Sequence, residues 1–188
     1  MIIMIIELSV IRLSLEADMS VADRSIDPRI MESAKGEFLQ KGFLDASLQE
    51  ICKNAGVTTG ALYKRFKGKE ELFCALVDNT VQDLEEVVRQ KSVLPATLTD
   101  EQLKKAWDMD REYMQWWFDY LYDRYDEMRL LLVFSDGTKY ANFEHEWVES
   151  MSHTTYAYYK EARRRGLTKT DISEKELHVM LSSFWTAI

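Results

Sequence analysis

The sequence has few residues that interrupt regular structure, with only two prolines and seven glycines in 188 residues. Collagen-like and low-complexity chains need many more of both, and a hydrophobic fraction of 46% excludes a largely disordered chain. Cysteine is equally scarce, and Cys52 and Cys74 lack the spacing of a zinc site or a disulfide framework. We therefore expect long helices and a reducing cytoplasmic location.

Positive charge is in deficit, because 24 Lys and Arg residues face 32 Asp and Glu residues and give a net charge of −8. This balance argues against a uniformly basic nucleic-acid coat and against an anionic-membrane binder. The apolar opening, residues 1–15, contains Glu7 and Arg12 and follows no basic segment, so it is neither a signal peptide nor a membrane span. We interpret residues 1–24 as a disordered N-terminal extension and expect no membrane partner.

Caps and breakers divide the remaining chain into successive helices, and strand signals are almost absent. Pro28 and Gly42 bound the first helix, whereas Ser47 and Glu50 form the capping box of a short second helix that ends at Gly56. The prediction is an all-α protein. The later helices are expected at residues 59–66, 69–94, 99–121, 125–134, 140–165 and 171–188.

Three further signals mark the helices of the second half. Thr99 and Gln102 form another capping box, and Gly166 holds the position just after the long helix that precedes it. Asp171 and Glu174 are expected to cap the last helix. That helix runs to the chain end with no stop signal, so we expect the domain to be truncated, with its final helix missing.

Residues 47–66, SLQEICKNAGVTTGALYKRF, form a short capped helix, a turn and a second short helix. This is the helix-turn-helix layout, in which the second helix can enter the DNA major groove. Leu62 and Phe66 anchor the second helix, and residues 57–69 contain four basic residues and no acidic one. The alternative is a helical hairpin that only packs, but packing would not require an acid-free basic stretch.

Residues 38–76 resemble the N-terminal domain of TetR-type transcriptional regulators. The positions that carry the resemblance are Phe38, Gly42, Ser47, Ile51, Ala55, Gly56, Val57, Thr58, Gly60, Leu62, Tyr63, Phe66, Lys69 and Leu72. The resemblance implies a three-helix DNA-binding domain at residues 25–72. A long helix would join it to a helical ligand-binding and dimerisation domain at residues 73–188.

The same resemblance implies the function and the residues that carry it. The protein would be a repressor that binds a near-palindromic operator as a homodimer and leaves it when a small hydrophobic or aromatic effector binds. Neither a catalytic residue nor a cofactor is implied. The residues expected on backbone phosphates are Ser47, Thr58, Tyr63 and Lys69. Those expected to face bases or thymine methyl groups are Thr59, Gly60, Ala61 and Lys64.

Aromatic side chains are concentrated at positions 107–125, on more than one face of the predicted helix. With acidic residues nearby, they would suit a flat, apolar and cationic ligand. The alternative is that these rings form core and interface packing. The candidate ligand-binding residues are Trp107, Tyr113, Trp117, Tyr120, Phe143 and Trp147.

A metal-dependent enzyme is the rival function, because His145, Glu149 and His153 share one helical face. The run is H-E-x-x-E and offers no third well-placed ligand, which favours a solvated acidic face. His178 is interpreted as a core or interface residue, and the arginines at 163–165 as a solvated helix end. A DNA-binding protein without a small-molecule sensor is the remaining alternative.

Overall fold

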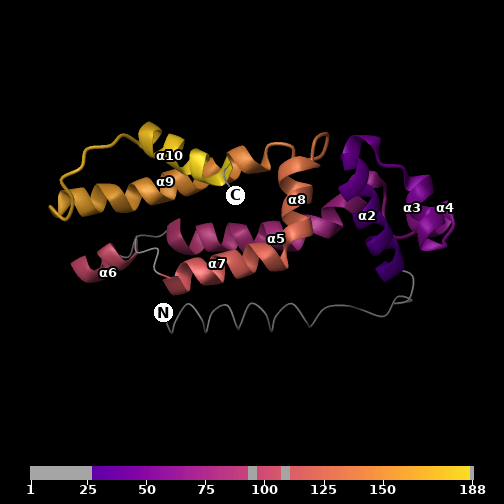
Figure 1. Ribbon diagram of the computed structural model, residues 1–188, viewed down its shortest axis with the longest axis horizontal. Coiled ribbons are helices and arrows are strands. Elements are labelled where there is room, and N and C mark those ends of the chain that lie inside the picture. Colours follow the sequence, from indigo (N-terminus) through magenta and orange to yellow (C-terminus); the bar gives the residue numbers. More distant parts are fainter. Residues whose placement is uncertain (1–26, 93–96, 107–110, 187–188) are drawn as a thin grey trace.

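A computed structural model describes residues 27–92, 97–106 and 111–186, and every regular element in these ranges is an α-helix, as predicted. The predicted extension at residues 1–24 lies outside them. In chain order (Figure 1) the helices are α2 (Asp27–Asp45), α3 (Leu48–Ala55), α4 (Thr59–Tyr63), α5 (Lys69–Ser92), α6 (Asp100–Lys105), α7 (Arg111–Asp123), α8 (Tyr125–Val133), α9 (Phe143–Arg164) and α10 (Glu174–Thr186).

The helices form two groups joined by α5. Figure 1 shows α2, α3 and α4 together at one end of the molecule, with α5 running away from them beside α7. Helices α9 and α10 pack against each other, and α8 contacts both α2 and α5. No helix within the described ranges is long and apolar enough to cross a membrane.

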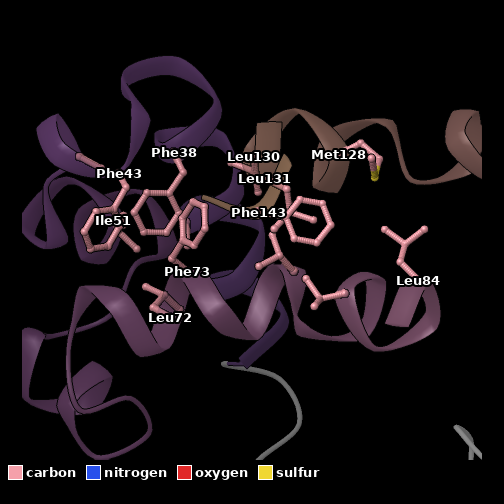
Figure 2. Close-up of a cluster of buried hydrophobic side chains, with 14 of the residues drawn as sticks. Phe38, Phe43, Ile51, Leu72, Phe73, Leu84, Met128, Leu130, Leu131 and Phe143 are labelled. Atoms are coloured by element: carbon pink, nitrogen blue, oxygen red, sulfur yellow. The ribbon is translucent and has the colours of Figure 1, made fainter. Parts of the chain in front are cut away.

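The hydrophobic core is continuous along α5. Phe38, Phe43 and Phe73 pack ring against ring at one end, with centroids 5.2 to 6.1 Å apart, and Leu84 and Leu130 lie farther along (Figure 2). Because residues 72 and 73 both lie inside α5, the predicted domain boundary crosses this shared core. A movement of α5 is therefore felt on both sides of the boundary.

Several predicted helix ends are confirmed. Gly42 interrupts α2 with a φ of 74°, and Gly56, with a φ of 65°, ends α3 through hydrogen bonds to the Cys52 and Lys53 carbonyls from the Val57 and Gly56 amides. Local residues set other helix ends as well. The capping box of Thr99 and Gln102 starts α6, and Gly166 follows the end of α9. Helix α5 is described to Ser92, before Pro95.

Other predicted ends are wrong. The tract expected at 99–121 is not one described helix, because α6 ends at Lys105 and α7 begins at Arg111. The helix expected from residue 140 begins at Phe143, after a turn stabilised by the Ser135 and Thr138 hydroxyls. The second predicted helix of the helix-turn-helix also has only five helical residues, after which backbone bonds continue to Phe66.

The start of α10 is capped by Ser173 and not by the predicted Asp171. The Ser173 hydroxyl accepts from the Glu176 amide at 3.2 Å, and the Glu176 carboxylate accepts from the Ser173 amide at 2.7 Å. Asp171 instead pairs with Arg163 at the end of α9. The cap moved by two residues because Asp171 has a stronger, oppositely charged partner.

Two glycine substitutions are expected to change stability in opposite directions. Gly137 has a φ of 84°, and a Cβ there would lie 2.5 Å from Leu44 Cδ2. Because left-handed backbone is costly for alanine, Gly137→Ala should lower the free energy of unfolding by about 1–2 kcal/mol. Gly36 lies inside α2 with open space around it, so Gly36→Ala should raise it by about 0.5–1 kcal/mol. Urea denaturation would measure both, and changes of equal sign would contradict the prediction.

Candidate nucleic-acid interface

The short helix α4 is held in place by contacts on its inner side. Leu62 is fully buried, and the Ser33 hydroxyl of α2 donates to the Ile51 carbonyl of α3 at 2.9 Å. Thr58 caps α4 as predicted, because its hydroxyl accepts from the Ala61 amide at 3.1 Å. These contacts fix α4 against α2 and α3 and leave its other side facing outward.

The outward side of α4 contains most of the predicted DNA contacts. Thr58, Thr59, Gly60 and Lys64 are exposed, and Tyr63 keeps 53% of its surface accessible. Ala61 is half-buried beside them. Hydroxyl donors, a small-residue backbone and one ammonium group therefore share a convex surface of the size that enters a major groove.

The four basic residues at 57–69 differ in whether their side chains already have partners within the protein. Arg65 is paired with Asp27 at the start of α2, so its charge is used within the protein. Lys69 donates to the Leu44 and Ala46 carbonyls at 2.9 and 3.0 Å, which leaves one of its three donor hydrogens. Neither Lys64 nor Lys67 forms an ion pair with another described residue. These two lysines provide the positive charge of the interface that is not already held by bonds within the protein, since the ammonium group of Lys69 is held by two neutral carbonyls.

The predicted capping box of Ser47 and Glu50 does not form. The Ser47 side chain makes no capping hydrogen bond, and Glu50 pairs with Lys53 at 3.3 Å. The carboxylate of Glu37, from the preceding helix, accepts from the Ser47 amide at 3.0 Å and from Lys41 at 2.8 Å. Because the cap comes from ten residues upstream, the Ser47 hydroxyl stays available to an external acceptor.

The electrostatics of Glu37 follow from this role. Its side chain is only 4% exposed, and burial raises the pKa of its carboxyl group. The hydrogen bonds from Lys41 and Ser47 lower the pKa more, so the net value lies below the ordinary one. Glu37 is therefore ionised at neutral pH and supports the start of α3.

Glu37→Ala is expected to lower the free energy of unfolding by about 1–3 kcal/mol at pH 7, since a buried amide and an ammonium lose a charged partner. The folded-state pKa is depressed, so the contribution of Glu37 exists above its ordinary pKa and disappears as the pH falls through the folded value. Denaturation curves between pH 3 and 7 should show the difference from the unsubstituted protein shrinking with acid. The exposed Glu32→Ala is the control, and an equal loss there would contradict the prediction.

Comparison with known proteins identifies the kind of domain to which α3 and α4 belong. Residues 30–76 match the family model described as bacterial regulatory proteins, tetR family. The N-terminal domain belongs to the TetR family. The match supports a helix-turn-helix DNA-binding domain, in which α4 is the second helix of the motif.

Curated relatives match only a short part of this chain. The transcriptional regulator SrpR of Pseudomonas putida is 40% identical over 57 residues, which are 30% of this chain and 27% of SrpR. The uncharacterised regulator TtgW of Pseudomonas putida is also 40% identical over 57 residues, which are 30% of this chain and 42% of TtgW. The matched part thus spans less than half of these relatives.

Solved TetR-family structures share the fold of both helix groups. SCO3833 from Streptomyces coelicolor A3 superposes with a TM-score of 0.58 at 19% identity, covering 84% of this chain and 73% of its own. PfmR from Thermus thermophilus gives 0.56 at 18% identity, covering 82% and 81%. The likeness extends past the TetR-family domain and so covers the helical second group.

The predicted ligand-binding residues fall into two separate groups. Tyr113, Trp117 and Tyr120 cluster on α7, where the Trp117 and Tyr120 rings stack 5.8 Å apart. Phe143 and Trp147 stack 6.4 Å apart on α9 and border a cavity of about 950 Å³ between α5, α9 and α10, which the α7 rings do not line. Trp107, the sixth candidate, lies outside the described residues.

The cluster on α7 has the contacts of a packed core. Trp117 is 8% exposed, and the Arg124 guanidinium lies 4.2 Å above the Tyr120 ring while it pairs with Asp83 of α5 at 2.8 Å. Burial raises the pKa of the Tyr120 hydroxyl, which stays protonated. This group therefore joins α7 to α5 through packing, the alternative that the sequence left open.

The histidines take up contacts that the sequence did not show. His145 meets His178 with ring centroids 6.3 Å apart, and His153 pairs with Glu174 at 3.0 Å. In the described part of the chain, no three His, Cys, Asp or Glu side chains are grouped to hold a metal ion. His145, Glu149 and His153 all remain exposed, as a solvated face requires, although His153 also reaches Glu174 at the start of α10.

Two of the three arginines at the end of α9, Arg163 and Arg164, are exposed as expected of a solvated helix end, whereas Arg165 is largely covered. Arg165 bonds the Leu98 carbonyl at 2.6 Å, Asp100 at 3.1 Å and Glu161 at 2.6 Å. The bonds from Arg164 and Arg165 lower the pKa of Glu161 to about 2. The end of α9 is thereby joined to the start of α6.

Proposed function

We propose that this protein is a ligand-responsive transcriptional repressor that binds a near-palindromic operator as a homodimer. The observation that carries the proposal is the exposed outer side of α4, with Tyr63 and the unpaired charge of Lys64, within a TetR-family domain. Such a regulator acts in the cytoplasm, where the DNA is. Residues 25–72 would bind DNA, and residues 73–188 would bind the effector and the second subunit.

The DNA contacts would divide into two kinds. The free hydroxyl of Ser47, the Thr58 O–H and the remaining donor of Lys69 suit backbone phosphates, as does the Tyr63 hydroxyl. The residues placed to face base edges are Thr59, Gly60, Ala61 and Lys64. Lys67, which is exposed and forms no ion pair with another described residue, would add a phosphate contact.

Dimerisation would set the spacing of the two recognition helices. Successive major grooves on one side of the duplex lie about 34–36 Å apart, so a two-fold dimer must present two α4 helices at that separation. Val179 and Met180 of α10 are 57% and 62% exposed and offer apolar surface for such contacts. The effector would change the spacing and empty the operator.

The loop at residues 135–142 would transmit the change together with α5. The Phe43 amide donates to the Phe134 carbonyl at 3.1 Å, and the Lys139 amide donates to Glu70 at 2.9 Å. The Tyr140 hydroxyl donates to Asp78 at 2.5 Å, and burial together with that bond raises the pKa of Tyr140 to about 12. Because this loop leads directly into α9, a displacement of α9 would reach α2 and the start of α5.

Binding to the DNA upstream of its own gene, measured across a salt series, tests the proposal. We expect sequence-selective binding with a steep negative dependence of log K on log salt, because the interface neutralises phosphates. Random DNA of the same length is the control. Equal affinity for both would contradict an operator at that position.

A further inference from the structure

The cavity between α5, α9 and α10 has a volume of about 950 Å³. Sites for small molecules span roughly 300–1,000 Å³. Its apolar part is formed by Phe143 and Trp147, which are 7% and 6% exposed and stack at 16°, with Val88 of α5 beside them. An aromatic or aliphatic group of a ligand would pack on this surface.

The charged part of the lining is dominated by carboxylates. Glu85 of α5 and Glu146 and Glu149 of α9 border the cavity, and none of the three forms an ion pair with another described residue. Arg89, which also borders it, is neutralised by Glu86 through bonds of 2.6 and 2.5 Å. Lys175 is the remaining cation of the lining, so negative charge prevails.

All three histidines of the sequence line the same cavity, and the hydrogen bonding of one of them is determined. The buried Ser152 hydroxyl has a single hydrogen and donates it to the Val148 carbonyl at 2.6 Å. Its oxygen, 3.1 Å from His178 Nδ1, must therefore accept from an Nδ1–H group. In the neutral ring, Nε2 of His178 is then an acceptor, on a ring that borders the cavity.

We propose that this cavity binds a protonated organic amine with an aromatic or apolar body. The N–H donors of the amine would meet His178 Nε2 and the carboxylates of Glu146 and Glu149, and its body would pack on Phe143 and Trp147. A quaternary ammonium ion has the charge but no donor for Nε2, and a carboxylate is repelled. The inference rests on the proposed function, because the amine would be the effector.

A matched probe series tests the chemistry on the full chain without DNA. Naphthylethylamine, its N-trimethylated analogue, naphthylethanol and naphthylacetate share one aromatic body and differ in charge and donors. By calorimetry the amine should bind about tenfold to a hundredfold more tightly than the other three, since hydrogen bonds to charged groups are lost in each. An amine that binds no more tightly than the alcohol, or a preference for naphthylacetate, would overturn the inference.

Two histidine variants locate the acceptor. His178→Phe should reduce the preference for the amine over its trimethylated analogue, because one of the acceptors of the amine is lost, whereas His153→Phe, at a side chain 80% exposed on the rim, should keep it. Glu149→Gln, at an exposed position that spares the fold, should weaken both cations relative to the alcohol. Unchanged selectivity in both His178→Phe and Glu149→Gln would overturn the assignment.

Operator binding is measured separately, so the two proposals fail in different ways. Selective DNA binding without amine selectivity would overturn the amine site and leave DNA binding intact. Amine binding that never releases operator DNA would support the site but contradict its role as the effector site.

Discussion

Replacing Tyr63 and Lys64 together by alanine is expected to weaken operator binding by about 30- to 1,000-fold, because two contacts worth about 2–4 kcal/mol in total are lost. Both side chains lie on the exposed side of α4, and Tyr63 is 53% exposed. Neither supports the fold, since α4 is anchored by the fully buried Leu62. The loss should therefore appear in DNA binding and not in stability.

Fluorescence anisotropy with operator and random DNA over a salt series would measure the effect. The slope of log K against log salt should become less steep by about 1, as expected for one lost phosphate or base contact by lysine. The matched control is the Tyr122→Ala and Lys104→Ala pair, which removes the same two side chain types far from α4. Tyr122 is 82% exposed. Equal losses in both variants would refute the assignment of α4 as the recognition helix.

Phe73→Ala is expected to lower the free energy of unfolding by about 3–5 kcal/mol, the cost of a large cavity in a packed core. The Phe73 ring is fully buried and lies edge-on to Phe38 and Phe43, with centroids 5.2 and 5.6 Å away (Figure 2). These three rings join α5 to α2, so the cavity would open where the DNA-binding domain meets the connecting helix.

Guanidinium denaturation followed by circular dichroism would measure this loss, and operator affinity should fall with it at temperatures near the lowered midpoint. Phe118→Ala is the control, because Phe118 is 48% exposed and a surface change of this kind costs about 0.5 kcal/mol or less. A loss below about 1 kcal/mol for Phe73→Ala would mean that the ring cluster does not support the fold as described.

The local features of the fold could be predicted because they depend on neighbouring residues. Gly56 requires a left-handed backbone, Thr99 and Gln102 cap each other across one turn, and Thr58 caps α4 in the same way. The predictions failed where a distant group competed with the local one. At the start of α3, the Ser47 amide donates to Glu37 of the preceding helix and not to Glu50, the partner expected from the sequence.

The exposure of the candidate DNA interface could be predicted because the interface consists of one short segment, whose exposed side follows from the burial of Leu62 at helical spacing. The bonding partners of its basic side chains could not be predicted from the sequence. The pairing of Arg65 with Asp27 and the bonds from Lys69 to the Leu44 and Ala46 carbonyls join residues more than twenty positions apart. No sequence pattern within one helix could show which basic side chains are already bonded within the protein.

By itself the sequence determined the all-α class, several helix ends and the position of the candidate recognition segment, since each follows from hydrogen bonds and side-chain spacing within a few residues. Only the tertiary structure decided which aromatic residues border the cavity. The α7 rings of Trp116, Trp117 and Tyr120 belong to or pack against the central core cluster, whereas Phe143 and Trp147 of α9 line the cavity together with His178 of α10. Which rings are packed in the core and which border the cavity depends on which helices contact each other. Those contacts join segments that are distant in the sequence, so no single helix encodes them.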